Sequence, residues 1–212
     1  MKKNSILMGF VVLMAGACNS LEETPEAFVV SETFYKNDKD ANAAVIAVYN
    51  AINDGQHTLY NRLIQISTEM ATDDYEAGPR ARNAHVRAIS GLTHDASNDR
   101  MLELWRQSYD GINRANIAID NLSNNPNLTA ELAKTYINEA KFIRALLYFN
   151  LVRWFGGVPL VLHETTSLDT QTLNVANATE SEIYNQLIKD LTDAENLPVP
   201  GKEGLKGRAT AG

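Results

Sequence analysis

Residues 128–155 read LTAELAKTYINEAKFIRALLYFNLVRWF, and this stretch decides the fold class. Apolar residues recur along it at helical spacing, among them Ile137, Ala140, Ile143, Leu147 and Leu151. The segment ends at Gly156-Gly157, with Pro159 close behind, and both residue types terminate helices. The sequence therefore predicts one long helix over 128–155 with a broad apolar face.

Four other segments have helical spacing. They are a helix capped by Asp38, a shorter one over Leu59–Glu69, a stripe from Leu102 to Ile119, and a helix opened by the capping-box pair Thr179 and Glu182. The positions expected to be buried include Ala41, Ala44, Val45, Val48, Leu102, Ile112, Asn116, Ile119, Ile183, Leu187, Leu191 and Ala194. No segment shows a convincing strand pattern, so we expect an all-α protein.

Short loops join these helices in pairs, which predicts a tetratricopeptide-like stack of helical hairpins. Residues 208–212 resemble the first turn of a further helix. A helix cannot bury its apolar face against nothing, so we expect the stack to be incomplete at the carboxy terminus. Residues 31–212 are then the amino-terminal part of a longer helical domain.

Composition limits the classes of partner. The 212 residues are 44% hydrophobic and 21% charged, and 19 basic against 26 acidic side chains give a formal net charge of −7. This is the profile of a globular protein, and its acidic balance argues against nucleic acid as a partner. The single cysteine, Cys18, excludes disulfide frameworks and cysteine-ligated zinc.

The amino terminus carries the pattern of an export signal. A basic start at Lys2 and Lys3 precedes the apolar stretch Ile6–Ala17, which as a helix is about 18 Å long and too short to span a bilayer. Ala15-Gly16-Ala17-Cys18 resembles the lipobox of bacterial lipoproteins. We therefore expect residues 1–17 to be a lipoprotein signal peptide, Cys18 to be lipidated, and residues 18–30 to form an acidic tether. The alternative is an ordinary signal peptide with an incidental cysteine.

Several segments, taken in order, resemble the SusD/RagB family of starch-utilisation-type outer-membrane lipoproteins. They are residues 25–49, 104–116, 139–160, 182–194 and 207–210. The resemblance implies an α-helical lipoprotein, anchored in the outer membrane and facing outwards, that acts as a lid on a TonB-dependent (SusC-like) transporter. It also implies that the protein binds glycans or oligosaccharides, catalyses no reaction and needs no cofactor.

The prominent residues of these segments are interpreted as structural. Arg144 lies on a largely apolar helix, where a buried guanidinium must be paired. Asn116 is expected to hold a neighbouring turn, and Trp105 and Tyr109 to pack between helices. Gly156, Gly157 and Pro159 are expected to reverse the chain, because they lack the spacing of a phosphate-binding loop.

The polar stretch from Met70 to Asn98 is predicted to be an irregular loop, and long loops in compact domains are often functional. In the SusD family the corresponding loop supplies part of the sugar site. The resemblance thus implies ligand-binding roles for Asp73, Asp74, Tyr75, Arg80, Arg82 and His85. The alternative is that the carboxylates brace the loop and the rest are solvated. One aromatic face covering about 100 Å² contributes about 2.5 kcal/mol, less than millimolar affinity requires, so Tyr75 alone is not enough.

Enzyme and metal functions find little support. His163-Glu164 lacks the second histidine of a metalloprotease helix, and Asp73 and Asp74 lack the spacing of a calcium-binding EF-hand. No carboxylate pair is distinguishable as the acid and base of a glycosidase. We expect no catalysis and no metal. The second functional hypothesis is a helical-repeat scaffold lipoprotein that organises envelope protein complexes.

Overall fold

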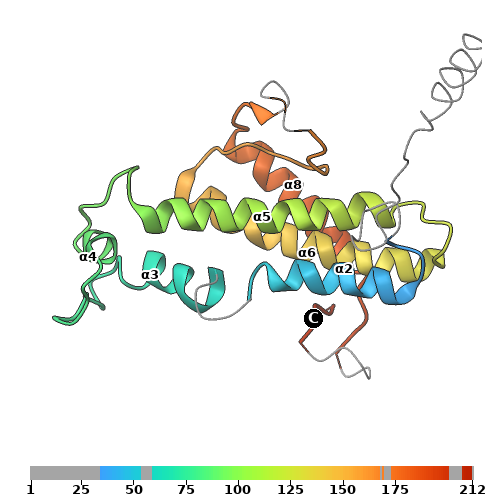
Figure 1. Ribbon diagram of the computed structural model, residues 1–212, viewed down its shortest axis with the longest axis horizontal. Coiled ribbons are helices and arrows are strands. Elements are labelled where there is room, and N and C mark those ends of the chain that lie inside the picture. Colours follow the sequence, from blue (N-terminus) through green and yellow to red (C-terminus); the bar gives the residue numbers. More distant parts are fainter. Residues whose placement is uncertain (1–33, 54–58, 168, 170–172, 201–206, 212) are drawn as a thin grey trace, which may run out of the picture. The chain divides into compact units, whose positions relative to one another are not determined.

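The computed structural model describes residues 34–53, 59–167, 169, 173–200 and 207–211 (Figure 1). The predicted signal peptide, Cys18 and the whole of the predicted tether lie outside these residues. The helices are α2 (Asp38–Asn50), the π-helix η1 (Leu59–Leu63), α3 (Ile64–Thr68), α4 (Ala84–Ser90), α5 (Asp99–Leu122), α6 (Ala130–Phe155) and α8 (Glu180–Ala194). The only pairing of β type in the described residues is an isolated antiparallel bridge between Pro159 and Asn177. The all-α prediction is confirmed.

Helix α6 lies at the centre of the hairpin stack. It packs against both α5 and α8 and also contacts α2, which lies beside α5 (Figure 1). Its predicted apolar residues are buried: Ala140, Ile143, Leu147 and Leu151 are at most 1% exposed. Each buried leucine or isoleucine contributes about 1.5–3 kcal/mol, so this helix organises the core.

The ends of α6 follow from its sequence. The Thr129 side chain accepts a hydrogen bond from the Leu132 backbone amide and caps the amino terminus. At the other end Gly156 has a φ of +70°, a conformation that suits glycine. The helix predicted over 128–155 is therefore confirmed to within two residues.

Helix α5 approaches its neighbours closely at Gly111. A methyl group built there would lie 2.7 Å from Leu147 Cδ1 and 3.1 Å from Ala51 Cβ. The absence of a side chain lets the backbone of α5 sit against both α6 and α2.

Three details of the predicted helices were wrong. Asn37, not Asp38, caps α2, because its side chain accepts from the Asp40 amide; Asp38 instead accepts from the Tyr136 hydroxyl at 2.8 Å. Leu102 and Leu191 are each 43% exposed.

The exposure of Leu102 and Leu191 has physical causes. Helix α5 contacts η1, α3 and α4 as well as α2 and α6. Leu104 is buried on the side of α5 that packs against the core, whereas Leu102 is on the exposed side. Helix α8 contacts only α6 among the described elements, so only its narrow edge of Ile183, Leu187, Asp190 and Ala194 is buried.

The segment Met70–Asn98 is more ordered than predicted. It contains the seven-residue helix α4, capped by Asn83, whose side chain accepts from the Val86 amide at 3.1 Å. Val86 and Ile89 pack with Ile66 in a small cluster separate from the main core. Residues 207 and 208 form a turn and a bend and residues 209–211 have no regular secondary structure, so the predicted helical turn is not found in the described residues.

Candidate ligand-binding site

The segment around α4 is fastened to the rest of the fold at its base. His85 Nε2 lies 3.0 Å from a carboxylate oxygen of Asp99 at the start of α5, and the Asn98 side chain donates to the His85 carbonyl at 3.0 Å. The Ser90 hydroxyl accepts from the Ala77 amide at 2.8 Å. Because of these contacts, the polar side chains between Thr72 and Arg82 are carried on a supported segment.

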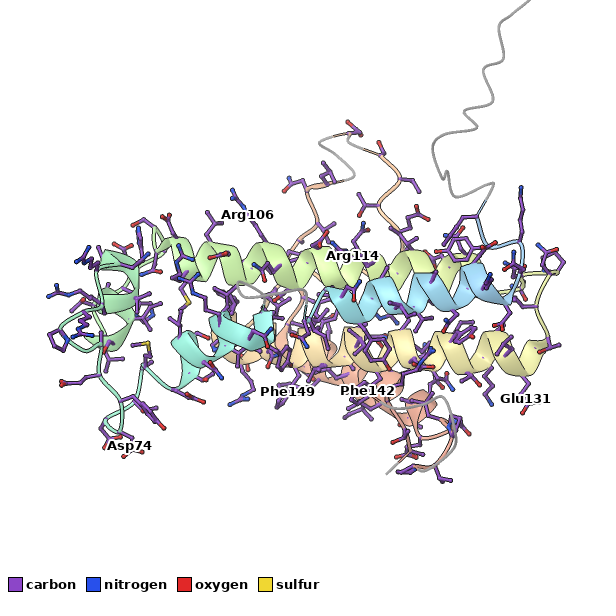
Figure 2. The ribbon with its side chains drawn as sticks, turned by 60° about the horizontal axis from the view of Figure 1, so that its bottom comes forward. Asp74, Arg106, Arg114, Glu131, Phe142 and Phe149 are labelled. Atoms are coloured by element: carbon purple, nitrogen blue, oxygen red, sulfur yellow. The ribbon has the colours of Figure 1, made fainter. Side chains whose placement is uncertain are left out.

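The structure places the predicted ligand-binding residues in two groups. Asp73, Asp74, Tyr75, Arg80 and Arg82 are exposed, with Tyr75 58% accessible. Asp74 lies at the tip of the segment and points away from the helices (Figure 2). None of the five makes a hydrogen bond or ion pair within the described part of the chain. They are thus open to an external ligand.

His85 differs from these residues, because its ring contacts Asp99 and the backbone of α5. The structure does not bring it to Asp73 or Asp74. His85 therefore fixes the segment to α5. Asp95 shapes the turn before α5, because its side chain accepts hydrogen bonds from the Ser97 hydroxyl and backbone amide, and these bonds hold the pKa of Asp95 below its usual range.

A polar hollow that the sequence did not indicate lies on the first turns of α5. Its volume is about 460 Å³, and it is lined by Asp99, Arg100, Leu102, Glu103, Arg106 and Gln107. Arg100 pairs with Glu103, and Arg100 Nε is buried with no hydrogen-bond partner among the described residues. Arg106 and Asp74 point to opposite sides in Figure 2, so the hollow and the loop tip are separate surfaces.

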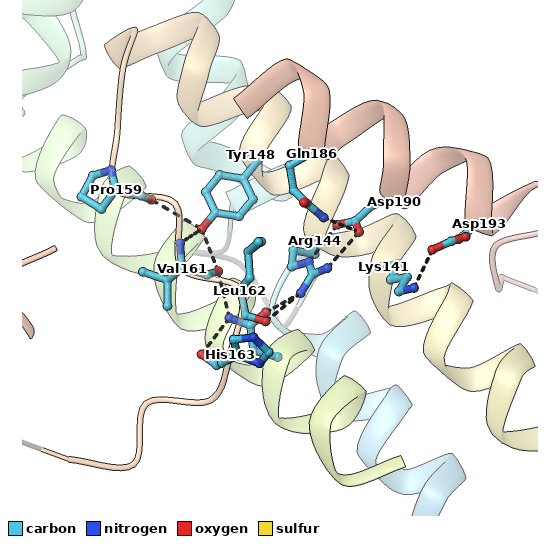
Figure 3. A network of polar contacts seen from close by, with 11 residues as sticks. Lys141, Arg144, Tyr148, Pro159, Val161, Leu162, His163, Gln186, Asp190 and Asp193 are labelled. Carbon is cyan, nitrogen blue, oxygen red and sulfur yellow. Dashed lines mark hydrogen bonds and ion pairs between the residues drawn. The ribbon is translucent and has the colours of Figure 1, made fainter. Parts of the chain in front are cut away.

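Arg144 takes part in a buried polar network (Figure 3). Its Nε and Nη2 donate to the two carboxylate oxygens of Asp190 on α8, each at 2.8 Å, and Nη1 donates to Asn116 Oδ1 at 2.8 Å and to the Leu162 carbonyl at 3.2 Å. The Arg144 and Asp190 side chains are 5% and 2% exposed. This geometry joins α5, α6, α8 and the segment after α6, and it leaves Arg144 out of reach of an external ligand.

The segment after α6 is held by side chains of the two central helices. Asn116 Nδ2 donates to the carbonyls of Val161 and His163 at 3.0 and 3.1 Å. The Tyr148 hydroxyl accepts from the Val161 amide at 2.7 Å, and the Tyr109 hydroxyl donates to the Pro159 carbonyl at 2.7 Å. Burial raises the pKa of Tyr148 to about 12.

Trp105 and the two glycines complete this region. The Trp105 ring lies 5.1 Å from that of Phe155 in an edge-to-face arrangement and 5.0 Å from that of Tyr109. Gly156 and Gly157 lead the chain away from α6 toward the start of α8. A methyl group at Gly157 would lie 2.6 Å from the Ala178 carbonyl oxygen. These residues make internal contacts and offer no surface for a ligand.

The described residues contain no group of three or more histidine, cysteine, aspartate or glutamate side chains placed to hold a metal ion. No helix in the described ranges has the length and hydropathy needed to cross a bilayer. The exposed segment presents acidic and basic side chains, which can accept and donate hydrogen bonds, together with one aromatic ring.

A stack of helical hairpins with a supported polar segment at one end of its longest hairpin defines the class: an α-helical repeat protein of tetratricopeptide type. Residues 32–210 match the SusD-like family model whose description is "Starch-binding associating with outer membrane". The chain belongs to the SusD-like family.

Curated relatives extend this result. The chain is 26% identical over 219 residues to SusD-like protein P2 of Formosa agariphila, covering 100% of this chain and 41% of the relative. It is 28% identical to a SusD-like protein of Bacteroides ovatus, covering 100% of this chain and 37% of the relative. The chain therefore spans about two fifths of the length of these relatives.

Solved structures also match this chain over about two fifths of their own length. A laminarin binding SusD-like protein superposes with a TM-score of 0.73 at 30% identity, over 84% of this chain and 38% of its own. Surface glycan-binding protein A from Bacteroides uniformis superposes with a TM-score of 0.69 at 26% identity, over 82% of this chain and 39% of its own.

Proposed function

We propose that this protein is a non-catalytic, glycan-binding lipoprotein of the outer membrane. In this proposal it captures oligosaccharides at the cell surface and passes them to a TonB-dependent, SusC-like transporter. The observation that carries the proposal is the family match over residues 32–210. Membership in a family described as starch-binding favours a carbohydrate ligand over a peptide or an ion.

The exposed segment supports a sugar site. Tyr75 presents a ring for the apolar face of a sugar, and Asp73, Asp74, Arg80 and Arg82 surround it in sequence with acceptors and donors for hydroxyl groups. None of these side chains is engaged elsewhere in the described structure, so a sugar would not have to displace an internal partner. Because one ring supplies only about 2.5 kcal/mol, the proposed site needs the polar side chains as well.

The proposed location depends on the amino terminus. Acylation of Cys18 would anchor the chain without a transmembrane helix, since two or more acyl chains hold a protein stably at a bilayer. The acidic residues that follow Cys18, including Glu22 and Glu23, would act as a tether facing the outside.

Affinity gel electrophoresis tests the glycan proposal. Laminarin and soluble starch are cast separately in native gels, since one structural relative binds laminarin and the family is described as starch-binding. We expect retardation by at least one polysaccharide, and we expect Tyr75→Ala to raise the dissociation constant about tenfold or more. Tyr184→Ala is the matched control, because Tyr184 is 39% exposed on α8, outside the loop. Retardation unchanged by Tyr75→Ala would refute the site, and a chain that neither polysaccharide retards would argue against the function.

A scaffold function is the second candidate, and one observation favours it. An apolar groove of about 310 Å³ lies between α6 and α8, lined by Phe142, Ala145, Leu146, Phe149, Tyr184, Leu187, Ile188 and Leu191. Phe142 and Phe149 are labelled along α6 in Figure 2. A groove of this kind suits an amphipathic helix of a partner protein rather than a sugar. If Ile188→Glu abolished copurification of an envelope protein while glycan retardation was absent in the wild type, the scaffold function would replace the first.

A further inference from the structure

A second polar cleft lies at the end of the α5–α6 hairpin remote from α4. It has a volume of about 510 Å³ and is formed by the last turn of α5, the connecting loop, the first turns of α6 and the end of α8. The lining residues are Leu122, Asn124, Asn125, Leu128, Ala130, Ala133, Lys134, Ile137, Asn138, Lys141 and Asp193.

Asn138 is the unusual residue of this cleft. Its side chain is 97% buried, and its Nδ2 makes no hydrogen bond with any described residue. Buried polar groups almost always have a partner, and leaving one unpaired destabilises the fold. Asn138 lines the cleft, and a half-turn of its amide would exchange the donor and acceptor ends.

The charges of the cleft are largely cancelled. Lys141 Nζ lies 2.6 Å from a carboxylate oxygen of Asp193, so the two nearest opposite charges are paired. Among the charged residues that line the cleft only Lys134 is left, and it is exposed at the rim. A cleft with one peripheral charge has no strong preference for an ionic ligand.

The remaining walls combine amides with aliphatic carbon. Leu122 and Ala133 are buried, and Leu128 and Ile137 are half-buried, so together they offer an apolar face. Asn124 stands exposed on the connecting loop with a φ of +60°. Amides beside an aliphatic surface match the hydroxyl groups and C–H face of a neutral sugar ring.

We propose that this cleft is a second carbohydrate site, which binds a neutral sugar residue through the Asn138 and Asn124 amides. Helix α5 has 24 residues and is about 36 Å long, so this cleft and the α4 segment lie at opposite ends of it. A polysaccharide that reaches both sites would be held at two points, which raises its avidity without stronger individual contacts. This inference rests on the proposed glycan-binding function.

Hydrogen–deuterium exchange of the full chain in detergent tests the inference. Laminaritriose and maltotriose are suitable probes because a trisaccharide is too short to bridge the two sites. If a probe binds, we expect slower exchange of the backbone amides in residues 122–134 as well as in the α4 segment. Asn138→Leu should raise the dissociation constant for the cleft at least tenfold and leave the protection around α4 unchanged. Its melting temperature should be equal or higher, since it removes an unpaired buried amide.

Asn124→Gly provides an independent variant. Glycine accepts the positive φ at this position, so the fold is retained while the rim amide is lost. We expect it to weaken protection of residues 122–134 about threefold or more, and this test applies even if Asn138→Leu does not fold.

Protection around α4 without protection of residues 122–134 would overturn the second site and leave the proposed function standing. Protection of residues 122–134 that survives both substitutions would overturn it equally. If neither probe protects either segment in the wild type, the result would count against the glycan-binding function itself.

Discussion

Arg208 and Glu139 form a bidentate ion pair that joins the segment 207–211 to α6, next to α2. Arg208 Nε and Nη2 lie 2.7 and 2.9 Å from the two carboxylate oxygens of Glu139, which is 1% exposed on α6. Arg208 Nη1 also donates to the Asn42 side chain at 2.6 Å, and the Tyr49 hydroxyl donates to Glu139 at 2.9 Å. These contacts fasten the segment 207–211 to both α2 and α6.

Arg208→Ala should destabilise the protein by about 3 kcal/mol, because it leaves the buried carboxylate of Glu139 without its cation. Lys141→Ala is the control, since Lys141 and Asp193 are 22% and 40% exposed and such a pair contributes about 1 kcal/mol or less. Urea unfolding followed by circular dichroism measures both. Equal losses in the two variants would contradict the structural role of the Arg208 pair.

Alkaline pH should destabilise the fold through its buried tyrosines. Burial raises the pKa of Tyr148 to about 12, above the value of 10.0 for an exposed tyrosine. The unfolded chain therefore ionises first, so the stabilisation is complete below about pH 10 and is lost as the pH rises toward 12. Each such tyrosine contributes a slope of about 1.4 kcal/mol per pH unit in this window.

Urea midpoints measured from pH 8 to 12 test this expectation. Tyr148→Phe should lower stability at neutral pH, because the Val161 amide loses the hydroxyl it donates to at 2.7 Å. The same variant should show a shallower decline above pH 10. A decline as steep as in the wild type would mean that Tyr148 does not contribute to it.

Gly157→Ala should destabilise the chain by about 1–3 kcal/mol. The added methyl group would lie 2.6 Å from the Ala178 carbonyl oxygen, a backbone atom that can move only if the start of α8 moves. Gly78→Ala is the matched control, because nothing lies within 4 Å of its added carbon. Thermal unfolding of the two variants should differ by several degrees, and coincident transitions would show that this close approach is not required.

Cys18→Ala should release the protein from the membrane fraction. The substitution removes the only thiol in the sequence and hence the proposed site of acylation. Flotation of cell envelopes in a density gradient at high salt, followed by immunoblotting with an antibody to residues 128–155, measures the distribution. A variant that still floats with membranes would contradict the lipid anchor.

Local sequence determined where all the described helices except α4 lie. Helix periodicity and capping depend on residues a few positions apart, so the long helix now defined as α6 and the capping box of Thr179 and Glu182 could be predicted without knowing any partner. Resemblance to the family also predicted a ligand-binding role for the segment that carries Tyr75, and that ring is exposed in the structure.

Tertiary packing decided which side chain meets which. The sequence indicates that Arg144 needs a partner, but only the packing of α8 against α6 selects Asp190, 46 residues away. Tertiary packing likewise pairs Glu139 with Arg208, and it leaves Asn138 Nδ2 without a hydrogen-bond partner among the described residues. Periodicity specifies the direction of a side chain around its own helix, whereas burial and pairing depend on the neighbouring elements, which residues distant in the chain supply.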